Sequence, residues 1–88
     1  MNKYIVTYDL NTPGKSYSGL ISKIKSYQHS KICESVWIIR SNIDSSEIRN
    51  SLVKEIDSND SLFVAKLAGE AAWRNCIDSS DNIKKILN

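Results

Sequence analysis

The hydrophobic pattern of the chain begins with an extended segment that is apolar on both sides. Residues 3–9 are β-branched or aromatic at most positions, which suits a pleated strand. A strand that is apolar on both faces normally lies in the interior of a sheet. We therefore expect a central strand here, ending in Asp9 and followed by a loop over residues 11–15 that contains the only proline.

Two later segments have the period of an amphipathic helix. Across residues 17–27 apolar side chains recur at spacings of three and four, and Ser16 is the expected N-cap. The second segment begins after Asp44, which has Glu47 three places on in the manner of a capping box. Its apolar stripe predicts a helix that continues to Ile56, before four turn-forming residues.

Two more segments read as strands that are apolar on both faces. We expect residues 32–41 to form strand in two pieces, bent or hairpinned near Glu34 and Ser35, after a polar break at residues 28–31. Residues 61–67 are the last clear strand. The resulting order is strand, helix, strand or strand pair, helix, strand.

The last nineteen or so residues have a weaker pattern. Residues 71–73 suit either a helix or a short edge strand, whereas residues 80–82 have the composition of a helix start. We therefore divide the chain into a domain over residues 1–69 and a C-terminal tail over residues 70–88 with a short helix. The tail is expected either to swap onto a partner subunit or to fold back over its own sheet.

This order predicts an α+β protein, a ferredoxin-like β-α-β-β-α-β plait whose antiparallel sheet carries two helices on one face. Two helices leave the second face of an apolar sheet bare, and a soluble monomer rarely exposes so large a patch. A second copy is the economical cover, so we expect a homodimer. The side chains expected at its interface are Trp37, Ile39, Phe63 and Trp73. The alternative is that the tail, with Trp73, covers the face itself.

Composition and charge exclude only a few classes of protein. The 88 residues make one domain, with 41% apolar and 25% charged residues and a net charge of +2, which permits nucleic-acid binding without requiring it. No apolar run approaches the roughly 20 residues that span a bilayer, so no membrane association is expected. Cys33, Cys76 and His29 are too few for a structural zinc site. We interpret both cysteines as reduced thiols and expect a cytoplasmic protein.

Three short motifs resemble one family when they are taken together. Residues 4–10 (Tyr-Ile-Val-Thr-Tyr-Asp-Leu), residues 34–37 and residues 60–64 are similar to segments of the small CRISPR-associated adaptation protein, the ferredoxin-like partner of the spacer integrase. The similarity covers residues 3–69 and also fits the related virulence-associated protein D toxins. It implies a role in antiviral defence and a homodimer in which Asp9 of each protomer approaches the two-fold axis.

The resemblance implies two kinds of activity. Some members are described as metal-dependent nucleases in which paired aspartates hold Mg²⁺, and others as DNA-binding scaffolds without catalysis. Asp9 is accordingly the candidate catalytic residue and Mg²⁺ ligand, because Mg²⁺ accepts one or two carboxylates together with substrate phosphate. The alternative is that Asp9 only caps the loop that follows it.

Several other side chains are candidate contacts for RNA or DNA. Lys15 is the only basic residue between Asp9 and the first helix, the resemblance places Ser35 near Asp9, and Arg40 belongs to a scattered set of cations. The other members of that set are Lys3, Lys23, Lys25, Lys31 and Lys66. His29 is expected to be a solvated polar residue. We expect a homodimer that binds nucleic acid or a protein partner without catalysis, the alternative being a Mg²⁺-dependent endoribonuclease or nuclease.

Overall fold

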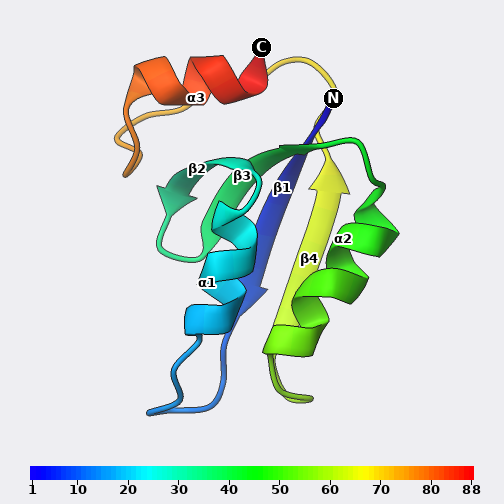
Figure 1. Ribbon diagram of the computed structural model, residues 1–88. Coiled ribbons are helices and arrows are strands. Elements are labelled where there is room, and N and C mark those ends of the chain that lie inside the picture. Colours follow the sequence, from blue (N-terminus) through cyan, green and yellow to red (C-terminus); the bar gives the residue numbers. More distant parts are fainter.

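The computed structural model describes residues 1–88 as a four-stranded antiparallel sheet with two helices on one face and a third on the other (Figure 1). The elements are β1 (Asn2–Asp9), α1 (Ser18–Lys25), β2 (Gln28–Cys33), β3 (Val36–Ser41), α2 (Ser45–Leu52), the 3-10 turn η1 (Val53–Glu55), β4 (Ser61–Lys66) and α3 (Ser80–Leu87). The strands lie in the order β2-β3-β1-β4. The predicted ferredoxin-like plait is therefore confirmed, and β1 is a central strand.

The main core lies between the sheet and the pair α1 and α2. Alternate residues of β1 point into it, as the two-residue period of a strand requires, and meet Leu20 of α1 and Ile48 of α2. Trp37 and Ile39 of β3 are part of this core, with exposed fractions of 2% and 0%. The expectation that these two side chains lie at a dimer interface is wrong, because the chain's own helices already cover them.

The second face of the sheet is covered in part by the tail. Ile83 and Ile86 of α3 pack on Ile38 of β3, and Trp73 lies against the same cluster. The tail thus folds back over its own sheet, which was the alternative to a bare face. Trp73 is half-buried within its own chain. None of the helices is long and apolar enough to cross a membrane.

The two edges of the sheet differ. The backbone N–H groups of Ile77 and Asp78 donate to the carbonyls of Ile32 and Lys31, at 3.0 and 3.1 Å, so the tail occupies the outer edge of β2. The outer edge of β4 has no neighbouring strand. One edge of the sheet is therefore closed by the chain itself and the other is open.

Of four expectations about local structure, two are confirmed and two are wrong. Asp44 caps α2 by accepting from the N–H of Glu47 at 2.9 Å, and the hairpin bend falls at residues 34–35, as predicted. Ser16 is not the N-cap of α1, since the helix begins two residues later with Tyr17 in that place. The expected polar break at residues 28–31 is instead most of β2, because its alternate polar side chains face the pocket described below.

Candidate functional site

The part of the second face that the tail leaves uncovered surrounds Asp9. Asp9 pairs with Ser61, and Thr7 pairs with Phe63, so these four side chains lie on one face of the sheet at its open edge. They help to line a shallow hollow of about 360 Å³. We call these four residues the Asp9 surface. Phe63 is 61% exposed, the largest exposed fraction of any large apolar side chain.

The carboxylate of Asp9 is exposed and makes no hydrogen bond or ion pair within the chain. The loop that follows is held by Asp60 instead, whose carboxylate accepts from the N–H of Asn11 at 2.7 Å. The interpretation of Asp9 as a cap for that loop is therefore wrong. Asp9 is the one carboxylate of this surface, so a Mg²⁺ ion there would need further ligands from a second copy and from substrate. No group of three or more His, Cys, Asp or Glu side chains is placed to hold a metal ion.

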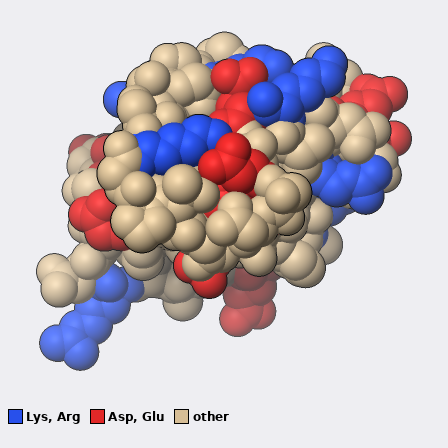
Figure 2. Space-filling view, turned by 90° about the horizontal axis from the view of Figure 1, so that it is seen from below, with Lys and Arg blue, Asp and Glu red and all other residues tan.

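The ammonium group of Lys15 is already paired with a carboxylate. Its Nζ lies 2.5 Å from Asp57, and this hydrogen bond raises the pKa of Lys15 and lowers the pKa of Asp57. The Tyr17 hydroxyl donates to Asp60 in the same group of loops at 3.0 Å. Figure 2, which views this end from below, shows acidic and basic side chains interspersed without a large area of one sign. A phosphate would therefore have to compete with Asp57 for Lys15.

The structure separates the other two candidate nucleic-acid contacts. Ser35 lies beside the end of β1, where its carbonyl accepts from the N–H of Tyr8 at 3.2 Å. Arg40 pairs with Lys3 at the opposite end of the sheet, and its Nε is buried without a partner. Lys3 itself donates to the carbonyl of Leu87 at 2.6 Å, at the end of α3. Ser35 is thus near Asp9, whereas Arg40 is not.

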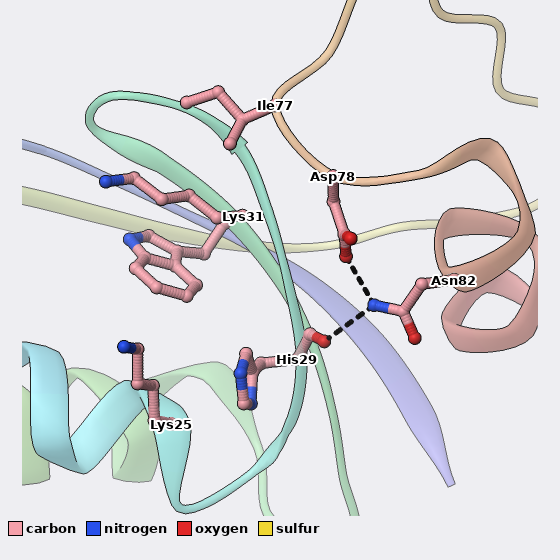
Figure 3. A pocket seen from close by; sticks show the side chains of 7 residues that line it. Lys25, His29, Lys31, Ile77, Asp78 and Asn82 are labelled. Carbon is pink, nitrogen blue, oxygen red and sulfur yellow. Dashed lines mark hydrogen bonds between the residues drawn. The ribbon is translucent and has the colours of Figure 1, made fainter.

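A second hollow, also of about 360 Å³, lies beside β2 (Figure 3). We call it the β2 pocket. Its lining side chains are Lys25, His29, Lys31, Trp37, Ile77, Asp78 and Asn82. Figure 3 shows Lys25, His29 and Lys31 on one side of the pocket and Asp78 with Asn82 on the other.

The rings and cations of the β2 pocket are placed by the strands beneath them. His29 and Lys31 are alternate residues of β2, and Lys31 pairs with Trp37 of β3, so all three face the same side of the sheet. The His29 and Trp37 ring centroids are 5.7 Å apart, and Lys31 Nζ lies 5.5 Å from the Trp37 ring. His29 Nδ1 lies 2.9 Å from the carbonyl of Tyr27, so Nδ1 carries a proton and Nε2 is left for a ligand.

Asp78 is the acidic member of the pocket, and its carboxylate is fully engaged. It accepts from the Ser30 hydroxyl at 2.6 Å, from the N–H of Ser79 at 2.8 Å and from the Asn82 amide. The Ser30 hydrogen bond is the main cause of a lowered pKa of Asp78, followed by the Asn82 bond. These bonds tie the tail to β2, so we assign Asp78 a structural role.

The sequence did not indicate this pocket as a unit. From the sequence, Lys25 and Lys31 are only members of a scattered set of cations, and His29 is expected to be a solvated residue. The missed signal is the alternation within residues 28–33: read as a strand, it would have placed His29 and Lys31 on one face. The contribution of Asp78 and Asn82 depends on the fold of the tail, which sequence spacing does not reveal.

Comparison with known proteins supports the fold. A structure described as a hypothetical protein TT1823 from Thermus thermophilus superimposes with a TM-score of 0.65 and 22% sequence identity, covering 84% of this chain and 90% of that chain. No protein-family model matches the sequence, and no curated protein matches it. The class that fold and site define is therefore a small ferredoxin-like α+β protein with an Asp9 surface and a β2 pocket.

Proposed function

We propose that the protein is a cytoplasmic homodimer that binds nucleic acid without cutting it, and that two copies associate along β4. The observation that carries the dimer is the open edge of this strand. Residues 61–65 contain neither proline nor charge, and Phe63 stands 61% exposed beside the edge. Natural proteins normally protect a free edge with charged residues, proline or a covering segment. The other edge of this sheet has such a cover, as described above.

A two-fold axis beside β4 would let the unpaired backbone groups of this edge form hydrogen bonds in both copies. Two identical strands pair antiparallel across such an axis, because an isologous contact uses the same surface twice. Phe63 would then lie close to the partner's β4. The resemblance to CRISPR-associated adaptation proteins supports nucleic acid as the partner, and the free thiols of Cys33 and Cys76 suit a reducing compartment.

This dimer would keep the two Asp9 carboxylates apart. β1 of one copy and β1 of the other would be separated by both β4 strands, which at about 4.8 Å per strand spacing is about 14 Å. Antiparallel pairing would also put the two Asp9 residues towards opposite ends of the joined sheet. Carboxylates that share one Mg²⁺ must lie within about 4 Å of each other. The edge-paired dimer therefore favours binding over metal-dependent cleavage.

A Mg²⁺-dependent endoribonuclease or nuclease is the second candidate, and one observation favours it. Asp9 and Phe63 belong to the same exposed surface, so two copies packed face to face through Phe63 would bring their Asp9 residues together. In that arrangement the paired carboxylates would hold the ion, and the ion would supply charge neutralisation and an activated water. The two candidates thus differ in the geometry of the same dimer.

Sedimentation equilibrium tests the dimer itself. We expect twice the chain mass of 9.9 kDa for the natural protein and a shift towards monomer for Phe63→Ser. Ile77→Ser is the matched control, since Ile77 is also apolar and 56% exposed but lies away from β4. A natural protein that stays monomeric at high micromolar concentration contradicts the proposal.

Disulfide trapping distinguishes the two dimers. In a background with Cys33 and Cys76 replaced by Ala, Phe63→Cys should cross-link on mild oxidation and Asp9→Cys should not, if the edges pair. Efficient cross-linking through Asp9→Cys would instead support the face-to-face dimer. In that case, RNA and DNA cleavage with Mg²⁺ should be lost in Asp9→Ala and kept in the control Asp81→Ala.

Fluorescence anisotropy with labelled single-stranded RNA and double-stranded DNA tests the partner. We expect binding without Mg²⁺ that weakens as salt rises, because phosphate contacts release counterions. The substrate should remain intact when Mg²⁺ is added. Absence of binding to either nucleic acid at low salt would leave a protein partner as the remaining class.

A further inference from the structure

We propose that the β2 pocket is a phosphate-binding site in which Lys25 and Lys31 supply the donors. This inference rests on the proposed function only where the phosphate belongs to a nucleic acid, because the same pocket would also take the phosphate of a free nucleotide. The site lies on the edge of the sheet opposite to β4 and uses none of the dimer residues.

The two donors converge from two elements. Lys25 comes from the last turn of α1, and Lys31 comes from β2 (Figure 3). A tetrahedral phosphate presents oxygens in several directions, so it can accept from donors that approach from different sides. A planar carboxylate would accept fewer of these hydrogen bonds.

These donors lack strong partners within the chain. Lys25 makes no hydrogen bond or ion pair within the chain. Lys31 has Glu34 at 3.6 Å, but the Glu34 side chain is 90% exposed, and such pairs contribute little. The interaction of Lys31 with the Glu34 carboxylate is therefore weak, and an anionic ligand can take the place of that carboxylate.

The acid of the pocket does not neutralise the cations. Asp78 lies across the pocket from them and already accepts three hydrogen bonds, from Ser30, Ser79 and Asn82. The two lysines and Asp78 give the lining two positive charges against one negative charge. The pocket therefore retains a positive side on which an anion would rest.

The size of the pocket and its other side chains allow a ligand that is larger than phosphate alone. A volume of about 360 Å³ lies at the lower end of the range of small-molecule sites. Ile77 is 56% exposed at the pocket and offers an apolar contact, and the Lys31 side chain lies over the face of Trp37. A sugar or base attached to the phosphate would thus find apolar contact beside the cationic wall.

Calorimetry and tryptophan fluorescence test the site with five probes: inorganic phosphate, adenosine 5′-monophosphate, adenosine, and a short RNA with and without a 5′-phosphate. We expect the monophosphate to bind and adenosine to bind much more weakly. Lys25→Gln/Lys31→Gln should weaken monophosphate binding at least about tenfold, because hydrogen bonds from charged donors are the strong ones. Lys54→Gln/Lys85→Gln removes the same charge elsewhere on the surface and should bind as the natural protein does. Thermal unfolding checks that both double variants are folded.

The outcomes test the phosphate site independently of the dimer. Equal losses in monophosphate and RNA binding identify the pocket as a nucleic-acid contact, whereas loss confined to the monophosphate identifies a free-nucleotide site. Absence of monophosphate binding at millimolar concentration, or equal binding by the Lys25→Gln/Lys31→Gln variant, overturns the inference. Phe63→Ser should dissociate the dimer yet bind the monophosphate normally, so the two proposals fail independently.

Discussion

The indole N–H of Trp37 donates to the hydroxyl of Tyr8 at 3.0 Å, between two strands of the sheet and inside the main core. Both side chains are buried, with exposed fractions of 2% and 8%. The bond joins the start of β3 to the end of β1, one residue before Asp9. It therefore helps to fix the position of the Asp9 surface from within the core.

Tyr8→Phe should lower the free energy of unfolding by about 1–3 kcal/mol, because it leaves the Trp37 N–H buried without a partner. Urea denaturation measures the loss. Tyr27→Phe is the matched control, since Tyr27 is half-buried and its hydroxyl makes no hydrogen bond. An equal loss in the two variants would show that the Tyr8 hydroxyl has no special role.

Gly19→Ala should raise the free energy of unfolding by about 0.5–1 kcal/mol, because alanine is the better helix former in the first turn of α1. The added methyl group meets only the end of the flexible Glu55 side chain, which has to move. Its contact with Lys23, at 4.0 Å, is weak and partly exposed. In a Glu55→Ala background the gain should be complete. A loss of stability in that background would contradict this explanation.

Acid should weaken the attachment of the tail through Asp78. Its pKa in the folded chain lies below the ordinary value of 3.8, chiefly because Ser30 donates to it. The stabilisation is therefore complete above that value and is lost as the pH falls through the lower folded-state pKa. Asp78→Asn should lose less stability than the natural protein between about pH 5 and pH 2. Asp81→Asn, an exposed change three residues further along the chain in α3, should keep the natural slope.

Ile83→Ala should cost about 2–5 kcal/mol in unfolding free energy, because it opens a cavity between α3 and Ile38 of β3. Ile83 is 1% exposed, so the site has few ways to fill the space with solvent. Ile77→Ala, which truncates an exposed isoleucine of the same tail, should cost much less. Equal costs in urea denaturation would mean that α3 does not dock firmly on the sheet.

The sequence predicted the plait because its signals are local. The apolar run that ends at Asp9, the Asp44 cap and the turn at residues 34–35 each depend on neighbours in sequence, and the structure has all three. The polar segment 28–31 was misread, because its alternation reflects a pocket that the tail helps to form. Which face of β3 packs under α1 and α2 is likewise a long-range matter, so the placement of Trp37 and Ile39 at an interface was wrong.

Because Ile77 and Asp78 occupy one rim of the sheet, each molecule has a single rim that accepts another strand. In the proposed dimer, two-fold pairing would use that rim in both molecules, and growth would then stop at two. A chain shortened at residue 69 would carry acceptor rims on both sides, and head-to-tail addition would have no natural end. The tail would then limit the association of copies to two.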